Sequence, residues 1–367
     1  MKQDKPIYYH FEDDLKKYPD AWCYIVWSKR GPGKTYSSLK YQYENKIPII
    51  YMKRTNDDID LICHENKREG DYEDFDASPY VPINRDIGSC IKAVKIDKGL
   101  GGFYEHEQDE NGKLSPTGLP ISYCLSFNAV KRYKGFDFSQ CDWIEMDEFI
   151  PQLGERVLRK EGELLLDFYM TVLRDRLKRG KKPVKLVLFA NAEDISTPIT
   201  NTLEVIDIMA DLNASGQTHF YDSERGIMLH HITNDEVPIA ESEKTGIYKA
   251  MANTAWGIKS FEGEFSNNDF SNVMKLSIKG YSPFIHVRER THDYYIYLNK
   301  NNGNMYMCSI KGKCLFEYDL NLENHQKLFY IEHLLDLRET CIEGRLKFEK
   351  YSMYDLIINY KRFFDVS

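Results

Sequence analysis

The sequence has 367 residues, of which 42% are hydrophobic and 29% are charged, so we expect about two domains with a sizeable core. The formal net charge of −8 excludes a uniformly basic coat for nucleic acid, and any polyanion site must therefore be local. The 8 cysteines form no C-x-x-C pair, and we identify no signal peptide or membrane-length apolar run, which favours free thiols in a reducing cytosol and no membrane contact.

The first chemical signal lies between an apolar strand predicted over 21–27 and a helix predicted over 35–44. The connecting segment is Ser28-Lys29-Arg30-Gly31-Pro32-Gly33-Lys34-Thr35. A glycine-rich turn of this kind points backbone N–H groups at a phosphate, which also feels the positive end of the helix dipole. Lys34 can reach the β- and γ-phosphates, and the Thr35 hydroxyl can bind Mg²⁺. The alternative is an ordinary strand–turn–helix, since Ser28 stands where the usual pattern has glycine.

Several strands follow in the next hundred residues. Apolar runs predict strands over 47–52, 91–97, 103–107 and 121–127. The segment 56–76 is rich in Asp and Glu, which favours a solvated helix and loop. The segment Asp109–Lys113 resembles a hairpin turn. Three basic clusters lie in loops or at element ends: Lys53 with Arg54, Lys131 with Arg132 and Lys134, and a dense run from Arg174 to Lys185. All three could contact the backbone phosphates of DNA, and the alternative for each is a solubilising surface.

The second chemical signal is an acidic pair, Asp147-Glu148, which follows a strand predicted over 141–146. In a parallel sheet, the carboxyl end of this strand lies beside the phosphate loop. Asp147 could hold Mg²⁺ through water, and Glu148 could polarise an attacking water. Alone, such a pair is usually a solvated acidic turn. Read together with the loop, it favours hydrolysis of a nucleotide, with ATP and Mg²⁺ as the cofactors.

Further candidates lie beyond the acidic pair. A helix predicted over 161–177 carries Arg174 and Arg176 near its end, and a strand over 184–190 ends at Asn191. Either arginine could reach a nucleotide bound by a neighbouring subunit, or could belong to a solvated helix end that favours cations. Asn191 could hydrogen-bond the γ-phosphate or the attacking water, or could cap the strand. Arg30 could contact the γ-phosphate or link to the acidic pair.

The pattern of elements changes near residue 205. Strands alternating with helices over 1–205 predict a parallel α/β domain. A helix is predicted over 199–212, and a linker subdomain over 206–255 is mixed and polar, with small helix and strand signals over 213–255. The block 256–367 is rich in strands, predicted over 284–287, 294–298, 305–310 and 314–318. Lys300–Asn304 predicts a hairpin within it. Helices over 323–338 and 353–363 close the sequence.

Five segments together resemble the DNA-packaging ATPases of phi-29-like tailed bacteriophages. They are Lys29–Thr35, Ile50–Arg54, Met146–Ile150, Thr171–Arg176 and Phe189–Ala192. These segments occur in the order of the family and cover most of residues 20–200. Beyond residue 200, the resemblance depends on architecture and length.

The resemblance implies a P-loop (ASCE-type) ATPase domain and a C-terminal domain similar to an RNase H-type nuclease that has lost its catalytic acids. It implies a homo-oligomeric ring, a pentamer, that drives double-stranded DNA into an empty capsid from the portal vertex in the host cytoplasm. In the family, the C-terminal domain docks to the capsid, sometimes through a structural RNA. Lys34 and Thr35 would bind phosphate and magnesium, Asp147 the metal, and Glu148 would be the catalytic glutamate. Arg174, with Arg176 second, would act in trans; Lys131 or Lys134 would act at a subunit interface or on DNA.

Two alternatives stay open. A large terminase would also cut DNA, which requires clustered carboxylates, whereas Glu289, Asp293 and Asp319 make no recognisable set. A regulatory nucleotide switch would belong to a different class, but the guanine-reading Asn-Lys-x-Asp segment is missing. We therefore expect a packaging motor without nuclease activity.

Overall fold

The computed structural model describes residues 8–63, 77–108, 110, 114–152, 154–155, 157–240 and 243–366. The chain divides into two compact units, one of Met1–Thr202 with Leu212–Asn267 and one of Leu203–Asp211 with Asn268–Ser367. Residues 64–76 of the predicted acidic helix and loop lie outside the described residues, as do residues 109 and 111–113 of the predicted turn. Within the described residues, no helix is both long enough and apolar enough to cross a membrane.

The first unit alternates strands and helices in the way that the sequence predicts for an α/β protein. In chain order its elements are α1 (Phe11–Lys17), β1 (Cys23–Ser28), α2 (Lys34–Glu44), β2 (Ile49–Lys53), α3 (Asn56–Ile62), α4 (Val81–Ile87), β3 (Ile91–Asp97), β4 (Leu100–Gln108), β5 (Leu114–Ser126), η1 (Phe127–Tyr133), β6 (Trp143–Asp147), α5 (Glu161–Lys178), β7 (Lys185–Asn191), α6 (Pro198–Thr202), β8 (His219–Asp222), β9 (Ile227–Ile232), α8 (Gly246–Met251), α9 (Ala255–Gly257) and η3 (Ile258–Glu262). α7 (Ile206–Ser215) crosses the boundary between the units.

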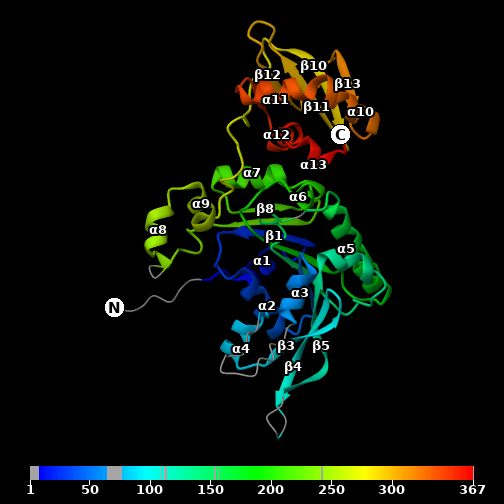
Figure 1. Cartoon of the computed structure of the whole chain (residues 1–367), viewed down its shortest axis with the longest axis vertical. Helices are drawn as coiled ribbons and strands as arrows, with labels where there is room; N and C mark the ends of the chain where they lie inside the picture. The colour runs from blue at the N-terminus through cyan, green and yellow to red at the C-terminus, as the bar shows by residue number, and fades with distance from the viewer. Residues whose placement is uncertain are drawn as a thin grey trace. The chain divides into compact units, whose positions relative to one another are not determined.

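The sheet of the first unit has the strand order β3-β4-β5-β2-β6-β7-β1-β9-β8. The six strands from β5 to β9 in this order pair in parallel, and antiparallel strands complete both edges. β4 and β5 extend as a long ribbon away from the central strands (Figure 1). The order inserts β7 between β1 and β6, so the ends of these three strands lie side by side.

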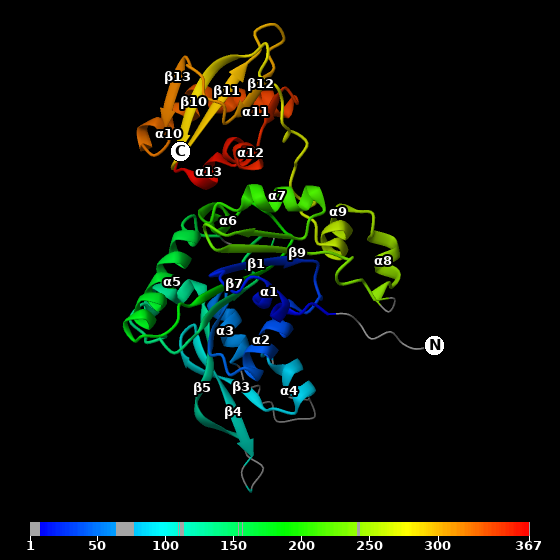
Figure 2. The ribbon, with the colours of Figure 1, turned by 180° about the vertical axis from the view of Figure 1, so that it is seen from behind.

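Helices cover the central strands, as a parallel sheet requires. Every residue of β1 is buried. Alternate side chains such as Tyr24 and Val26 share one core with Phe11 of α1, Leu39 of α2 and Ile59 of α3. The Phe11 ring makes edge contacts with rings on three different strands, Tyr24, Trp143 and Phe189. The view from behind shows α1, α2 and α3 next to one another (Figure 2). This packing fixes α2, whose first turn follows the predicted phosphate loop.

The second unit is built on a mixed sheet with the strand order β13-β10-β11-β12-β14. Its elements are β10 (Ser282–Glu289), β11 (His292–Leu298), β12 (Met305–Cys308), β13 (Phe316–Asp319), α10 (Glu323–Phe329), η4 (Tyr330–Leu334), α11 (Leu335–Ile342), β14 (Leu346–Phe348), α12 (Tyr351–Ile358) and α13 (Tyr360–Phe363). β10, β11 and β12 pair antiparallel, and β13 pairs with β10 in parallel. Two sheets with helices confirm the α/β class of the chain.

The main difference from the predicted elements lies in residues 199–255. The single helix predicted over 199–212 is two helices, α6 and α7. Strand β9 within the predicted linker subdomain is fully buried and pairs with β1, so this stretch extends the first sheet. The compact units accordingly have boundaries near 202 and 267 rather than at 205 and 255. The two histidines of β9 hid this strand in the sequence, because polar side chains interrupt its apolar run.

Candidate functional site

The glycine-containing loop of residues 28–35 connects β1 to α2 as the sequence predicts. Gly33 is the residue just before α2 and has a φ of 91°, and Gly31 has a φ of 88°. Glycine adopts this left-handed conformation at little cost, whereas a side chain would strain it. The carbonyl of Pro32 accepts a hydrogen bond of 3.0 Å from the backbone of Tyr9. The loop is therefore anchored from outside while its own N–H groups stay available.

Two lysines of this loop point in different directions. The ammonium of Lys29 donates to Asn234 at 2.7 Å and to the carbonyl of Val237 at 2.8 Å, which ties the loop to the segment after β9. The ammonium of Lys34 donates to the Ser28 hydroxyl at 2.5 Å and to Asn191 at 3.4 Å. Ser28 thus has a physical role at the position where the usual pattern has glycine: its hydroxyl holds the Lys34 ammonium at the edge of the sheet.

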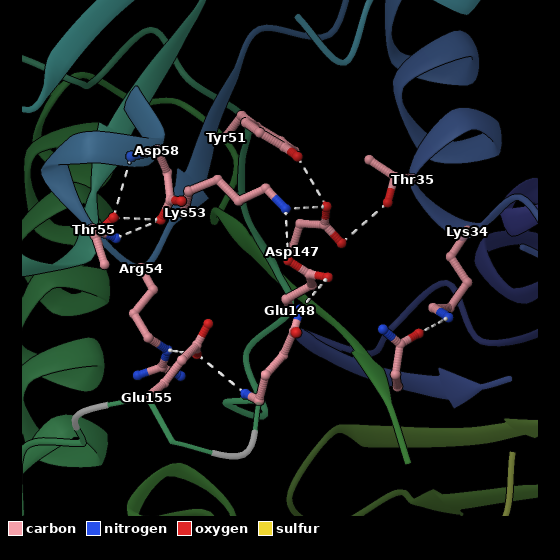
Figure 3. Close-up of polar contacts among 12 residues, drawn as sticks. Lys34, Thr35, Tyr51, Lys53, Arg54, Thr55, Asp58, Asp147, Glu148 and Glu155 are labelled. Atoms are coloured by element: carbon pink, nitrogen blue, oxygen red, sulfur yellow. Dashed lines mark hydrogen bonds and ion pairs between the residues drawn. The ribbon is translucent and has the colours of Figure 1, made fainter. Parts of the chain in front are cut away.

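Asp147 connects the loop to β6 and β2. Its Oδ1 accepts a hydrogen bond of 3.1 Å from Thr35, and its Oδ2 accepts from Tyr51 and from Lys53, both at 2.9 Å. Figure 3 shows these side chains pointing toward the Asp147 carboxylate from three sides. The sequence places Asp147 at the end of a strand, and the order β2-β6-β7-β1 brings that end opposite the loop.

Glu148 lies in a tight turn immediately after β6. Its φ of 57° is unusual for a residue with a side chain. The next residue, Phe149, donates its backbone N–H to the carbonyl of Phe189 at 3.0 Å, which secures the turn against β7. The Glu148 carboxylate accepts from Lys53 at 3.1 Å and from Gln152 at 3.3 Å. Backbone strain of this type concentrates at functional sites, where it aims a side chain.

Asn191 lies between the loop and the acidic pair. The parallel register of β1 and β7 places Ser28 directly beside Asn191. A pocket of about 370 Å³ opens here, lined by residues 30–36 of the loop and helix together with Asp147, Glu148, Ala190 and Asn191. The structure therefore brings together the loop, the acidic pair and Asn191 as the sequence predicts.

Burial and charge perturb the groups in this pocket. Burial lowers the pKa of Lys34 to about 8, against the opposing effect of Asp147 and Glu148. Burial tends to raise the pKa of Asp147, but the Lys53 ammonium outweighs it and holds that pKa below its usual range. Burial likewise opposes the charge of Lys53, yet Asp147 and Glu148 raise its pKa. A cluster of perturbed acids and bases in a pocket is typical of a functional site.

The residues present fit a magnesium ion. Thr35 Oγ1 and Asp147 Oδ1 lie 3.1 Å apart. Adjacent oxygen ligands of an octahedral Mg²⁺ lie about 2.9 Å apart, given metal–oxygen distances of about 2.0–2.1 Å. Because Tyr51 and Lys53 hydrogen-bond to Oδ2, Oδ1 is the oxygen that faces the loop. These residues could hold the ion directly or through a water.

Two predicted arginine roles need correction. Arg54 is only 5% exposed, and its guanidinium binds both carboxylate oxygens of Glu161 at 2.8 Å and the carbonyl of Phe149. Arg176 is 2% exposed and is held by Asp142 and by the carbonyls of Ser139 and Cys141. Neither guanidinium can reach DNA or a neighbouring nucleotide without leaving its buried partners. Arg54 joins the end of β2 to the first residue of α5, and Arg176 joins α5 to the segment just before β6.

Five of the other predicted cations are exposed. Arg174 on α5 has a side chain 63% exposed, and its Nε lies 3.8 Å from the Asp175 carboxylate. Lys131 is exposed; Arg132 pairs with Asp97 at 2.8 Å and Lys134 with Asp167 at 3.4 Å. Arg30 in the loop is 60% exposed and lies 3.7 Å from Glu193. These side chains remain available for partners of opposite charge.

Lys53 and Tyr51 are site residues that the sequence reading did not assign to the site. Lys53 was predicted to contact DNA, but its ammonium lies between Asp147 and Glu148. The available signal was its position at the end of β2, since the carboxyl ends of parallel strands share one edge. The missing information was that β2 is the neighbour of β6.

These features define a class: an α/β protein in which a glycine-containing strand–loop–helix meets an acid-terminated strand at the carboxyl edge of a parallel sheet. The same fold occurs in the viral genome packaging motor assembly of bacteriophage Phi-29, with a TM-score of 0.60, 14% identity, and coverage of 97% of this chain and 99% of that chain. It also occurs in the gp11 DNA packaging motor of Phi-28, with a TM-score of 0.60, 14% identity, and coverage of 99% of both chains. The sequence matches no protein-family model and no curated protein.

Proposed function

We propose that this chain is the ATPase subunit of a motor that moves double-stranded viral DNA into a preformed capsid. The observation that carries the proposal is the convergence of Lys34, Thr35, Asp147 and Glu148 on one pocket at the edge of the sheet. The fold shared with two packaging motors over nearly the whole chain supports it. The proposal includes a P-loop of the ASCE type, since β7 and Asn191 lie between the loop strand and the acid-terminated strand.

The loop backbone and five side chains at the pocket, those of Lys34, Thr35, Asp147, Glu148 and Asn191, have physical roles in this proposal. The backbone N–H groups of the loop and the Lys34 ammonium bind the phosphates of ATP. Thr35 and Asp147 would hold Mg²⁺, which would supply positive charge against the phosphates of ATP. Asn191 hydrogen-bonds the γ-phosphate or the attacking water.

Glu148 is the proposed catalytic base. Its side chain is 41% exposed and thus open to water, while Lys53 and Gln152 fix the orientation of its carboxylate. The carboxylate accepts a proton of the water whose oxygen attacks the γ-phosphorus, while the bond from that phosphorus to the β–γ bridging oxygen breaks and ADP leaves. Lys53 is a positioning residue, because it contacts both carboxylates of the acidic pair.

We propose a homo-oligomeric ring, a pentamer, at the portal vertex of the procapsid in the host cytoplasm. Arg174 is the proposed trans-acting residue, since its exposed guanidinium can stabilise charge on a neighbour's nucleotide, whereas Arg176 is buried. Lys131, Arg132 and Lys134 form the proposed surface for DNA phosphates. The second unit is proposed to be a nuclease-like domain of the RNase H type without catalytic acids that docks to the capsid, and a structural RNA is one proposed mediator.

The substitution Glu148→Gln tests the catalytic assignment. We expect ATP binding to persist and hydrolysis to decrease by about 100-fold or more, the scale of general-base catalysis. The matched control is Glu163→Gln on the exposed surface of α5, which should hydrolyse ATP at the wild-type rate. ATP turnover measured by phosphate release checks both variants. Wild-type turnover in Glu148→Gln would contradict the role of this residue.

The coupling to DNA is tested by the ATPase rate with and without DNA and portal-bearing capsids. Strong stimulation supports a motor, and an unchanged rate supports a nucleotide switch instead.

An all-Arg174→Ala ring should lose hydrolysis, and mixing Arg174→Ala with Glu148→Gln subunits tests whether the arginine acts across an interface.

DNA affinity should decrease steeply as salt increases, and a flat dependence would contradict phosphate contacts by Lys131 and its neighbours.

A further inference from the structure

A histidine–carboxylate cluster lies outside the proposed ATP pocket, at the edge of the first sheet formed by β8 and β9. His219 on β8 and His230 on β9 are directly opposite each other, with ring centroids 3.8 Å apart. Asp14 on α1 contacts both rings: its Oδ1 lies 3.3 Å from His219 Nε2, and its Oδ2 lies 2.8 Å from His230 Nδ1. One ligand atom from each residue lies within 4.8 Å of the others.

We propose that Asp14, His219 and His230 bind one Zn²⁺ or similar transition-metal ion. Imidazole nitrogens with a carboxylate oxygen are a donor set that zinc prefers. In a tetrahedral zinc site, adjacent ligand atoms lie about 3.3 Å apart, given metal–ligand distances of about 2.0–2.2 Å. The distance of 3.3 Å from His219 Nε2 to Asp14 Oδ1 already has this value. The distance of 2.8 Å from His230 Nδ1 to Asp14 Oδ2 is that of a hydrogen bond, so the carboxylate or the His230 ring must shift for a metal to replace the shared proton.

The surroundings of the cluster have the arrangement that orients metal ligands. His230 Nε2 lies 2.9 Å from Glu236 Oε2, so Glu236 can hold the ring with Nδ1 turned toward Asp14. His219 Nδ1 lies 2.8 Å from the Thr218 hydroxyl, which leaves Nε2 for the metal. Tyr9 donates to Asp14 Oδ2 at 2.6 Å. A carboxylate or hydroxyl partner on the second nitrogen of each histidine is the usual second contact in zinc sites.

The burial of the cluster is suited to a metal that joins elements. Asp14 and His230 are 3% and 5% exposed, so water competes poorly for them. The His219 side chain is 19% exposed, and water can supply a fourth ligand from that side. The backbone of Phe11 in α1 donates to Ser37 of α2 at 2.8 Å. The ion would therefore tie α1, and through it the helix that carries Lys34 and Thr35, to the β8–β9 edge.

A proton is the competing occupant of this cluster. Burial lowers the pKa of His230, but the hydrogen bonds to Asp14 and Glu236 outweigh it and raise the pKa to about 9. A protonated His230 can donate to Asp14 and to Glu236, and these hydrogen bonds join β9 to α1 without a metal. The experiment must therefore separate a metal site from a hydrogen-bonded cluster.

The experiment measures Zn²⁺ binding to the full chain in excess Mg²⁺, by metal content and by competition with a chromophoric chelator. We expect one Zn²⁺ per chain in the wild type and its loss in His219→Asn, while Glu236→Gln should bind about 10-fold more weakly. His292→Asn, an exposed histidine of the second unit, is the control and should retain the ion. Both histidine variants keep all 8 cysteines, so thiol binding cancels in the comparison.

A second measurement covers the case in which His219→Asn alters folding. Co²⁺ added to the wild type should give the intense visible absorption of a tetrahedral site, and Zn²⁺ should raise the thermal unfolding midpoint of the wild type and of His292→Asn but not that of His219→Asn. Equal Zn²⁺ content in His219→Asn and His292→Asn, or a wild type without stoichiometric metal, would overturn the proposal and leave the hydrogen-bonded cluster. ATP turnover is not a readout here, so failure of this proposal is distinct from failure of the proposed function.

Discussion

The carboxylates of the two sheets have contrasting environments. In the first sheet, Asp147 and Glu145 on β6 contact partners from other elements, including Lys53 on β2 and Ser38 on α2. In the second sheet, the register places Asp293 on β11 and Asp319 on β13 on either side of Arg288 on β10. Arg288 and Asp293 are exposed.

The comparison teaches that burial and long-range partners, rather than residue type, separate a chemical site from a charged surface. In the first sheet, low solvent access strengthens each interaction and perturbs the pKa values. In the second sheet, Asp293 and Asp319 have Arg288 as their neighbour in the register, and water screens the charges of the exposed Arg288 and Asp293. The four predictions below test this difference, from the largest expected effect to the smallest.

Glu145 should make the first unit sensitive to pH. Burial raises the pKa of Glu145 from 4.5 to about 8, although Ser38 and Gln42 hydrogen-bond to it. The unfolded chain loses this proton near pH 4.5 and the folded chain near pH 8, so the contribution of Glu145 to stability decreases as pH rises through this window. The full decrease is on the order of 5 kcal/mol, at about 1.4 kcal/mol per pKa unit.

Denaturant unfolding of wild type and Glu145→Gln at several pH values checks this prediction. The glutamine cannot ionise, so its stability should change less between pH 5 and pH 8.5 than that of the wild type. The exposed control Glu163→Gln should follow the wild-type profile. Parallel profiles for wild type and Glu145→Gln would show that the buried carboxyl does not control this dependence.

Arg176 and Arg174, two residues apart on α5, should have opposite phenotypes. Arg176→Met should decrease the free energy of unfolding by about 2–5 kcal/mol, because it leaves the buried carbonyls of Ser139 and Cys141 without their partner, at about 1–3 kcal/mol each. Arg174→Met should change it by no more than about 0.5 kcal/mol, as expected for an exposed side chain. Urea unfolding measures both, and equal effects would remove the distinction between a buried structural arginine and an available one.

Lys53→Met should decrease kcat by about 100-fold at saturating ATP and Mg²⁺, since Lys53 orients both carboxylates of the acidic pair. DNA affinity at a fixed salt concentration should stay near the wild-type value. If Lys53 contacts DNA instead, the variant would bind DNA more weakly and keep its DNA-free rate. Turnover and DNA titration of the same preparation separate these outcomes.

Asp293→Ala should have the smallest effect. Asp293 is exposed and lies 2.8 Å from His286, and a surface pair of this kind contributes little to stability. We expect no metal-dependent cleavage of plasmid DNA by either wild type or variant. Cleavage by the wild type that disappears in Asp293→Ala would assign nuclease activity to the second unit and erase the contrast between the sheets.

Much of the first unit could be predicted from local patterns. Strand β3 and helices α2 and α5 lie within one residue of their predicted bounds, because apolar periodicity depends on near neighbours in the chain. β8 and β9 were missed, since polar residues such as His230 and His231 interrupt the apolar run, and only pairing with β1 explains why this segment is buried. Strand neighbours are set by packing across the whole unit, which no local pattern contains.

The sequence by itself determined the loop from Ser28 to Thr35 and the acidic pair, because each is a local arrangement of backbone and side chains at a strand end. The tertiary structure decided which cations join them. Lys53 contacts the acidic pair because β2 pairs with β6. Arg54 and Arg176 are buried by their contacts with α5 and with the segments next to it. The physical reason is that a long cationic side chain has many possible partners along a chain, and only the packed sheet selects one.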